Sequence, residues 1–408
     1  MSDVNLMQIQ QALIRIRPYV ACSGVKSSVS LKNRLGIETF LKLENLNLSG
    51  SFKIRGAINA LLQVPADQLQ FGVIAASAGN HAQGVAYTCR LLGVKATIFM
   101  PVRSPMVKAA ATRELGADVR LVGMSYDEAY QAALVFQKAS GGFLLHGFHD
   151  SRVICGQGTI GLELLDQIPN LGMVIGSVGG GGMMAGVAVA IKAKRPDVTV
   201  IGVQSSAFPA MQRSFQEHRL IACAHGSTIA DGIAIKEPSA LTFSLIEQFV
   251  DDIILVNEDE IASAVMNLME WEHMLAEGAG AASLAGLLKL PPPTLAKLGG
   301  RAVACIVSGG NIDVNLLKRI IPSGLKYSGR LFRLAVRIQD RPGRLAELLN
   351  VVSGTGANLQ EVQHNRLFGA VAYEDVEVQI DLETIDQMHQ EQVMDALTKA
   401  KFKFAKLD

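Results

Sequence analysis

Short runs of apolar residues alternate with stretches of helical periodicity from Ile37 to about Leu325. Most of the runs are apolar on both faces, which is typical of parallel strands buried between two layers of helices. Loops at the carboxyl ends of such strands bind ligands. We therefore predict an α/β fold built on parallel sheets. The predicted strands are residues 72–76, 96–100, 117–122, 173–176, 199–203 and 301–307, and the clearest helices between them are residues 81–92 and 125–138.

The composition fits a large buried core. Of the 408 residues, 49% are hydrophobic and 18% are charged, and a prior of ~150 residues per domain gives two or three domains. The formal net charge of +1 argues against a nucleic acid or an anionic membrane as partner, because binding either needs clustered positive charge. The five cysteines form no C-x-x-C pair, so we expect neither a disulfide framework nor a zinc site. We also expect no signal peptide, and hence a cytoplasmic protein.

One segment, from Leu171 to Ile191, has the length and hydrophobicity of a membrane span. Seven glycines interrupt it, four of them consecutive at residues 179–182. Such a run would break a membrane helix, so we predict a buried strand, a loop and a buried helix instead.

A different pattern begins at about Arg330. Residues 322–324 and 327–329 contain proline, serine and glycine, and we predict a linker there. We therefore expect two domains, residues 1–325 and 326–408. A small sheet of alternating strands, as predicted for the second domain, leaves one face uncovered, so we expect a homodimer or homotetramer. The second domain reads as a ferredoxin-like βαββαβ unit, with strands at residues 331–338, 358–366, 371–381 and 401–407 and a first helix opened by residues 340–343.

Lys53 stands at the start of an apolar helix, in the segment Ser51-Phe52-Lys53-Ile54-Arg55-Gly56-Ala57. A lysine amine can bond to a carbonyl cofactor only when it is deprotonated and held in place. Taken alone, a lysine at a helix start is more often a solvated surface charge. Its meaning depends on the motifs at the other strand ends.

The glycine run Gly179–Gly182 lies between a predicted strand and an apolar helix. Backbone N–H groups without side chains can close around a phosphate at a helix N-terminus. The spacing fits neither the G-x-G-x-x-G motif nor the P-loop, so a nucleotide is not the obvious ligand. The alternative is a turn that lets strand and helix pack closely.

Two further motifs follow strands. Residues 77–84, Ser-Ala-Gly-Asn-His-Ala-Gln-Gly, start a helix with small residues and backbone donors that suit a substrate carboxylate, and Asn80 adds a side-chain donor. His81 is more readily a structural residue than a proton carrier. Ser308 ends the last strand, where its hydroxyl can meet a heterocyclic nitrogen or simply cap a helix.

Together these motifs resemble those of the threonine/serine dehydratases, pyridoxal-phosphate enzymes of the tryptophan-synthase-β fold type (fold type II). The resemblance runs in order over nearly the whole chain and implies two parallel-sheet subdomains within residues 1–325. Residues 326–408 resemble an ACT domain, a small-molecule regulatory module. The implied activity is that of a threonine ammonia-lyase. It converts L-threonine to 2-oxobutanoate and ammonia with pyridoxal 5'-phosphate, through removal of the α-proton and loss of the β-hydroxyl, and also acts on L-serine.

The resemblance implies individual roles. Lys53 holds the cofactor and later takes the α-proton, and Ser308 meets the ring nitrogen. Because a neutral hydroxyl does not hold that nitrogen protonated, loss of the β-hydroxyl competes well with a long-lived carbanion. Glu277 is expected near the ring, or else it only complements a helix dipole. The other implied contacts are Phe52 on the pyridine ring, Asn80 on its phenolic oxygen, Gly179, Gly180, Gly181, Gly182 and Met183 around the phosphate, and Ser77, Ala78, Gly79, Asn80 and His81 on the substrate.

Departures from the family pattern narrow the choice. Serine racemases of this fold use a serine at the position of Ala78 for a second proton transfer, and they bind a cation at positions that match Gln204 and Ala210. Ala78 has no hydroxyl to transfer a proton. Neither Gln204 nor Ala210 is an anionic oxygen ligand, so we predict no metal site. The alternatives are a serine-preferring dehydratase or racemase, and an amino-acid sensor whose catalytic half is vestigial.

The C-terminal module carries its own candidate site. Asp340, Arg341 and Gly343 form a turn, and Asn358 begins a strand, as in the ligand-binding corner of ACT domains. Such domains bind amino acids between paired copies, which implies a branched-chain amino acid as effector. The alternative is that the module only dimerises, because a pocket by itself shows no coupling energy. Whether the reaction serves isoleucine biosynthesis or threonine degradation stays open.

Overall fold

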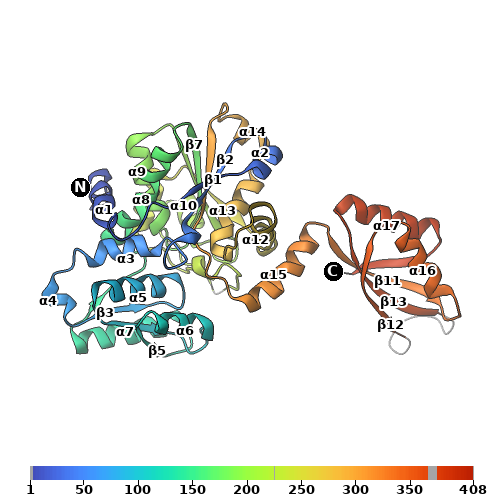
Figure 1. Ribbon diagram of the computed structural model, residues 1–408, viewed down its shortest axis with the longest axis horizontal. Coiled ribbons are helices and arrows are strands. Elements are labelled where there is room, and N and C mark those ends of the chain that lie inside the picture. The colour runs from blue at the N-terminus through green and yellow to red at the C-terminus, as the bar shows by residue number, and fades with distance from the viewer. Residues whose placement is uncertain (1–2, 225, 366–374, 408) are drawn as a thin grey trace. The chain divides into compact units, whose positions relative to one another are not determined.

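The computed structural model describes residues 3–224, 226–365 and 375–407, and the chain forms two compact units, Met1–Leu317 and Lys318–Asp408 (Figure 1). The division between the units and the predicted boundary at residues 325/326 both fall within helix α15 (Val314–Tyr327). The linker predicted at residues 322–324 was therefore wrong, since α15 continues through Pro322. The helix buries Ile320 and Gly324, and this packing outweighs the hydrogen bond that an interior proline removes.

The larger sheet of the first unit has six strands in the order β1-β2-β10-β7-β8-β9. Its pairs are parallel, except that β1 runs antiparallel to β2. The prediction of a parallel sheet is confirmed for five strands, of which β7, β8 and β10 match predicted runs. The strands β2 and β9 and the edge strand β1 were not among the predicted runs. The strands are β1 (Val25–Ser27), β2 (Thr39–Leu43), β7 (Leu171–Ser177), β8 (Thr199–Ser205), β9 (Asp252–Val256) and β10 (Ala302–Val307).

The smaller sheet has four parallel strands in the order β5-β4-β3-β6. Successive residues of β3 enter different cores: Val73 and Ala75 pack with α3 and α5, whereas Ile74 and Ala76 pack with α7. Helices thus cover both faces, which explains why the strand is apolar throughout. The strands are β3 (Val73–Ala76), β4 (Ala96–Met100), β5 (Asp118–Leu121) and β6 (Phe143–Leu144), and the helices are α3 (Lys53–Leu61), α5 (Asn80–Leu92), α6 (Met106–Glu114) and α7 (Tyr126–Ser140).

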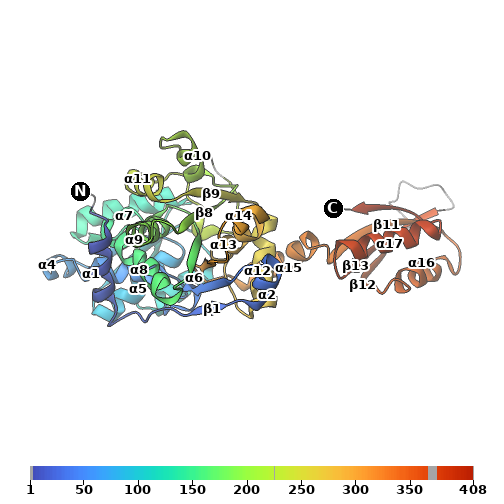
Figure 2. The same ribbon diagram turned by 90° about the horizontal axis from the view of Figure 1, so that it is seen from above.

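Helices also enclose the larger sheet (Figures 1 and 2). Helix α13 (Gly278–Lys289) contacts β7, β8, β9 and β10. Helices α8 (Ser151–Gln167) and α9 (Gly182–Lys194) pack together and share a core with Val174, Val200 and Ile306 of the sheet. The remaining helices are α1 (Leu6–Ile16), α2 (Val29–Leu35), η1 (Glu44–Leu46), α4 (Ala66–Leu69), α10 (Ala210–Glu217), η2 (Asp231–Ile233), α11 (Ala240–Phe249), α12 (Glu258–Glu272) and α14 (Pro292–Ala296).

Helix α3 belongs to both halves of this unit. It contacts α5 over the smaller sheet and α8 over the larger one. Its first residue is Lys53. The predicted catalytic lysine therefore lies where the two parallel-sheet layers meet.

The second unit has the predicted βαββαβ order. Its antiparallel sheet follows the order β12-β13-β11-β14, and two helices pack on it. None of the helices in the described residues combines the length and the apolar character that crossing a membrane requires. The elements are β11 (Leu331–Gln339), α16 (Arg344–Ser353), β12 (Asn358–Asn365), β13 (Asp375–Glu383), α17 (Gln387–Lys399) and β14 (Lys403–Leu407). Residue 366 of the predicted second strand and residues 371–374 of the third lie outside the described residues.

Candidate active site

The turn that carries Lys53 is attached to the end of β10. The backbone N–H of Phe52 donates to the carbonyl of Ser308 at 3.1 Å, and Ser51 forms a β-bridge with Gly309. The Lys53 amine donates to the carbonyl of Gly147 at 3.2 Å. Lys53 thus lies at the carboxyl end of a central parallel strand, where ligands bind in α/β sheets.

The environment of Lys53 favours its neutral form. Burial lowers the pKa of its amine to about 8, against the opposing pull of the Glu277 carboxylate. The amine lies 5.1 Å from the centroid of the Phe52 ring. A neutral amine is a nucleophile and a base, so Lys53 is equipped to bond to a carbonyl group and to take a proton.

The glycine run forms a tight loop between β7 and α9. Gly181 has φ +87° and precedes the first helical residue. A Cβ on Gly180 would lie 2.4 Å from the ring of Phe148, so this position has no room for a side chain. The first N–H groups of α9 have no acceptor within the helix, which makes the loop a suitable anion cradle. Because Phe148 follows Gly147, one short segment touches both the cradle and Lys53.

Gln157 of α8 is a residue that the sequence analysis missed. It is fully buried, and its amide has no hydrogen-bond partner among the described residues. A Cβ on Gly182 would lie 2.9 Å from its Oε1 atom. An unpaired amide beside the glycine loop indicates a polar ligand at this point. The only sequence signal is a glutamine flanked by glycines within an apolar helix.

Asn80 and Glu277 form a buried pair. The Asn80 amide donates to the Glu277 carboxylate, and the side chain of Asn311 donates to Asn80 Oδ1 at 2.8 Å. Burial, and next the charge of Asp231, raise the pKa of Glu277 to about 7. Glu277 makes no capping hydrogen bond at the start of α13. The alternative of a simple helix-dipole role is therefore disfavoured, because the carboxylate faces Asn80.

Ser308 lies beside the strand that leads to the cradle. It is 3% exposed, and its Oγ lies 3.1 Å from Oγ of Ser177, the last residue of β7. It also donates to the carbonyl of Ala279 at 3.3 Å. Ser177 can accept or donate here, so the two hydroxyls can bond to a ligand group that is either a hydrogen-bond donor or an acceptor.

The loop before α5 presents small residues and one histidine. Ser77 Oγ accepts a hydrogen bond from the Gly79 N–H at 3.2 Å, and Ala78 lies between them. His81 Nε2 lies 2.9 Å from the carbonyl of Leu145, which can only accept, so that nitrogen carries the proton. Burial lowers the pKa of His81 to about 3. A histidine that stays neutral and is bonded to the backbone supports the 145–147 segment and is not a proton carrier.

A short wall, η2, closes the site between the cradle and Asn80. A Cβ on Gly179 would lie 2.8 Å from Cα of Ile233, and one on Gly232 would lie 3.6 Å from the Glu277 carboxylate. Asp231, at the start of η2, forms an ion pair with Lys108 of α6. This pair links the wall to the smaller sheet, and no sequence pattern indicated it.

The two positions compared with a cation site do not form one. Gln204 Oε1 accepts from the backbone N–H of Gln212 at 2.9 Å, and Ala210 starts α10. Among the described residues, no group of three histidine, cysteine, aspartate or glutamate side chains is arranged to hold a metal ion.

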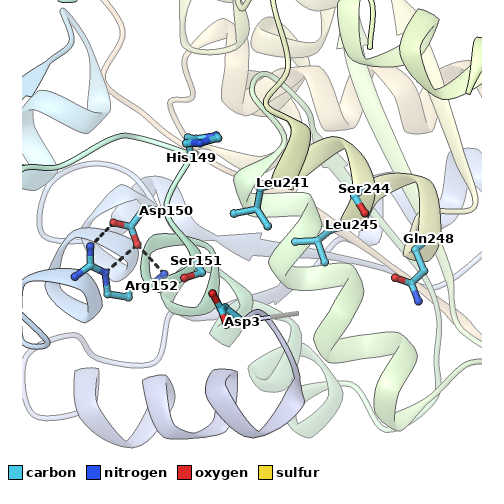
Figure 3. A pocket seen from close by; sticks show the side chains of 9 residues that line it. All are labelled: Asp3, His149, Asp150, Ser151, Arg152, Leu241, Ser244, Leu245 and Gln248. Carbon is cyan, nitrogen blue, oxygen red and sulfur yellow. Dashed lines mark hydrogen bonds and ion pairs between the residues drawn. The ribbon is translucent and has the colours of Figure 1, made fainter. Parts of the chain in front are cut away.

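A separate cavity of about 680 Å³ lies beside α11. Figure 3 shows Leu241 and Leu245 at its helical wall and the Asp150–Arg152 ion pair at the opposite wall. Of the described site residues predicted from the sequence, none lines it. Its lining includes His149, which directly follows Phe148 of the candidate site. The lining residues are Asp3, His149, Asp150, Ser151, Arg152, Leu241, Ser244, Leu245 and Gln248.

The predicted effector residues lie at two ends of the second unit's sheet. The turn with Asp340, Arg341 and Gly343 follows Gln339, which pairs with Asp375. Asn358 pairs with Glu383 at the opposite end of β13, and its amide donates to that carboxylate at 3.1 Å. One copy of the unit therefore does not bring all four residues to one ligand.

Comparisons with known proteins agree with this geometry. A family described as "Pyridoxal-phosphate dependent enzyme" matches residues 19–309. The L-threonine ammonia-lyase of Thermotoga maritima is 44% identical over 391 residues, 96% of this chain and 96% of that protein. The processed form of threonine deaminase isoform 2 from Solanum lycopersicum is similar in structure, with a TM-score of 0.73 and 33% identity, over 79% of this chain and 92% of that one. Maize serine racemase has a TM-score of 0.75 and 31% identity, over 80% and 99%.

The matches differ in extent. The Thermotoga relative aligns over 96% of this chain, so it reaches into the second unit. The family match ends at residue 309, within the first unit. The first unit therefore carries the likeness that all these proteins share.

Proposed function

The chain belongs to the family of pyridoxal-phosphate dependent enzymes and deaminates L-threonine with that cofactor, and we propose that Lys53 is the residue that holds the cofactor and takes the α-proton. The observation that carries this proposal is the position of Lys53. Its amine has a pKa lowered to about 8, and it bonds to the segment that also contacts the glycine loop. When bound, the cofactor supplies an electron sink for the pair left on the α-carbon.

The residues present fit pyridoxal phosphate. The loop from Gly179 to Gly182 offers backbone N–H groups to the phosphate, and the unpaired amide of Gln157 lies beside it. The paired hydroxyls of Ser177 and Ser308 are neutral partners for the ring nitrogen. Asn80, held by Glu277 and Asn311, is an oriented donor for an oxygen on the ring. Phe52 beside Lys53 offers an apolar face.

The substrate is held by the loop before α5. Backbone N–H groups at the start of this helix, together with Ser77, suit the carboxylate of the amino acid. Lys53 acts on the α-carbon from its own side of the site. His81 keeps the neighbouring backbone in place, and its neutral ring leaves Lys53 as the base.

We propose L-serine as a second substrate, turned over without racemisation. Maize serine racemase shares the fold at 31% identity, which favours a serine reaction as the second candidate. Position 78 here is an alanine, so it has no hydroxyl for a second proton transfer. An assay for D-serine beside pyruvate separates the two outcomes, and rapid formation of D-serine would overturn this choice. The alternative of an amino-acid sensor requires that the lysine or the glycine loop has been lost, and both Lys53 and the loop are intact.

We propose that the second unit is an ACT domain that binds a branched-chain amino acid between two copies of the chain. The support is its βαββαβ order, and the fact that Asp340 and Asn358 lie at opposite ends of one sheet. A dimer is then needed to bring such positions together. Initial rates on threonine with added isoleucine or valine test it, using Arg341→Ala and Asn358→Ala, with exposed Arg337→Ala as control. Equal rates at every effector concentration would reduce the unit to a dimerisation module.

Replacement of Lys53 by Ala tests the central proposal. Turnover of threonine should disappear, together with the visible absorbance of covalently held cofactor. Lys95→Ala, an exposed lysine of the same unit, is the matched control. Retention of turnover and of the absorbance band in Lys53→Ala would overturn the proposal.

A further inference from the structure

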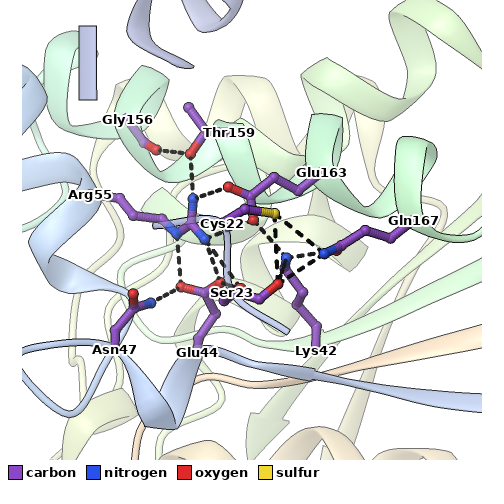
Figure 4. A network of polar contacts seen from close by, with 10 residues as sticks. All are labelled: Cys22, Ser23, Lys42, Glu44, Asn47, Arg55, Gly156, Thr159, Glu163 and Gln167. Atoms are coloured by element: carbon purple, nitrogen blue, oxygen red, sulfur yellow. Dashed lines mark hydrogen bonds and ion pairs between the residues drawn. The ribbon is translucent and has the colours of Figure 1, made fainter. Parts of the chain in front are cut away.

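A buried group of charged residues lies beneath the Lys53 turn, and Figure 4 shows it. The group contains two positive and two negative side chains, which are Lys42, Arg55, Glu44 and Glu163. The side chains of Lys42, Glu44 and Arg55 are 0% exposed, and that of Glu163 is 6% exposed. We call these four residues, with Ser23 and Thr159, the Arg55 network.

Arg55 uses its whole guanidinium group in this network. Its Nε and Nη2 atoms donate to Glu44 at 2.8 and 2.9 Å, and its Nη1 and Nη2 atoms donate to Glu163 at 2.7 and 2.8 Å. Thr159 and Ser23 accept further hydrogen bonds at 3.1 and 3.2 Å. Burial alone would lower the pKa of Arg55, but the two carboxylates raise it above its ordinary value. The planar group is thus fixed in orientation as well as in place.

Lys42 completes the network from β2. Its amine donates to Glu163 at 2.6 Å, to the carbonyl of Ser23 at 2.8 Å and to Gln167 at 2.8 Å. The network therefore ties together the loop before β1, the strand β2, η1, α3 and α8. Buried ion pairs of this kind contribute little stability compared with well-packed apolar side chains. What they provide here is a defined geometry.

The Arg55 network restrains the first turn of α3. Arg55 lies two residues after Lys53, and α3 has no side-chain cap at its start. A Cβ on Gly84 of α5 would lie 3.3 Å from Cβ of Lys53, and a Cβ on Gly156 of α8 would lie 2.5 Å from the carbonyl of Arg55. The turn is therefore held between α5 and α8, with the network beneath it and the end of β10 before it.

We propose that Arg55 is the positioning residue of Lys53: through the Arg55 network it fixes the first turn of α3, so that the Lys53 amine stays partly buried beside Gly147. The inference rests on the proposed function of Lys53. If the turn loosens, the amine gains access to water. Its proton affinity should then rise towards that of an ordinary lysine, and its aim at the substrate should worsen.

The test compares Arg55→Lys, which keeps the charge but loses the planar fork, with the milder Thr159→Val. The second change removes the hydrogen bond that Thr159 accepts from Arg55 and the one that it donates to the carbonyl of Gly156. The control is Ile191→Ala, a buried residue near the end of α9 that lies outside the network. Four quantities are measured on the full chain. They are kcat and KM for threonine per bound cofactor, the pH dependence of Lys53 labelling by acetic anhydride in the cofactor-stripped protein, and the urea midpoint.

Arg55→Lys should lower kcat at least tenfold with less than a threefold change in KM, and should shift the labelling curve of Lys53 to higher pH. Thr159→Val should do the same to a smaller extent, and it decides the question if Arg55→Lys does not fold. Ile191→Ala should lower the urea midpoint and leave kcat and labelling as in the wild type. If both network variants lower only the urea midpoint, Arg55 merely stabilises the fold and the inference is overturned.

A separate measurement isolates the proposed function. Borohydride reduction of the wild-type holoenzyme should fix the cofactor on the peptide that contains Lys53. If the cofactor is found on another lysine, the proposed function fails whatever the Arg55 variants do. If it is on Lys53 and the labelling curve of Arg55→Lys is unchanged, only the positioning role fails.

Discussion

The side-chain amide of Asn80 donates a hydrogen bond to the carboxylate of Glu277, across 197 residues of sequence. Asn80 starts α5 over the smaller sheet, and Glu277 precedes α13 on the larger one. The pair therefore joins the two halves of the first unit at the site. Glu277 is 3% exposed, so its ionisation depends on what surrounds it.

Glu277→Gln should change the pH dependence of stability. Burial raises the pKa of Glu277 from 4.5 to about 7, so the folded chain keeps this proton where the unfolded chain releases it. Stability is therefore lost as pH rises from about 4.5 to about 7, by up to about 3 kcal/mol relative to the glutamine variant. Urea unfolding of the cofactor-stripped proteins across this range measures the difference. Glu114→Gln, an exposed glutamate of α6, controls for the loss of a carboxylate, and a flat difference for Glu277→Gln would contradict the burial argument.

The rate of covalent cofactor attachment should follow the ionisation of Lys53. Because burial lowers its pKa from 10.5 to about 8, the neutral amine becomes abundant as pH passes 8. Stopped-flow absorbance on the cofactor-stripped protein should show the attachment rate levelling off above that pH. A lysine peptide mixed with pyridoxal phosphate is the reference for an ordinary amine. A protein rate that keeps rising in parallel with the peptide would show that the amine is not perturbed.

Gly180→Ala should weaken cofactor binding. The added Cβ would lie 2.4 Å from the Phe148 ring, which must move and disturb the loop. We expect at least a tenfold rise in the Kd of the cofactor, about 1.4 kcal/mol. Gly24→Ala is the control, since its Cβ would meet only Leu43 at 3.7 Å. Combining Gly180→Ala with Phe148→Leu should restore part of the affinity, and no restoration would mean that the clash is not the cause.

The ion pair between Lys108 and Asp231 should respond unequally to the loss of either partner. The Lys108 side chain is 10% exposed, whereas that of Asp231 is 52% exposed. Asp231→Asn leaves a buried ammonium without its partner and should cost about 2 kcal/mol in the free energy of unfolding. Lys108→Met leaves a carboxylate that water can reach, and should cost less than about 1 kcal/mol. Urea unfolding of both variants and of the double variant measures the pair. Equal losses would show that Lys108 is more hydrated than the structure indicates.

Much of the fold could be predicted because parallel strands are apolar on both faces. Runs such as residues 302–307 and the glycine loop after β7 carry this local signal. The proposed role of Lys53 follows from its heptapeptide only together with the other motifs at the strand ends. Pro322 favours a break in the helix locally, but the packing of α15 overrides this preference, so the predicted linker is absent there.

The buried charges could not be predicted. Lys42 lies in the segment Thr-Phe-Leu-Lys-Leu, whose pattern suits a half-exposed strand with lysine in water. Its burial depends on Glu163, which is 121 residues away. The same holds for Gln157, because a local pattern carries no information about which distant group will approach a side chain. Polar contacts across long sequence separations are therefore what the structure adds.

The position of β10 has a consequence for synthesis of the chain. It is the last strand of the first unit to leave the ribosome, yet it lies in the middle of the larger sheet, between β2 and β7. Until residues 302–307 emerge, β2 and β7 each present an unpaired edge, and such edges attract other strands. From the emergence of β7 until that of β10 the nascent chain thus carries two unpaired strand edges, and it depends on the late insertion of β10 to pair both at once. Truncated products that end before this strand should therefore be targets for chaperones and proteases.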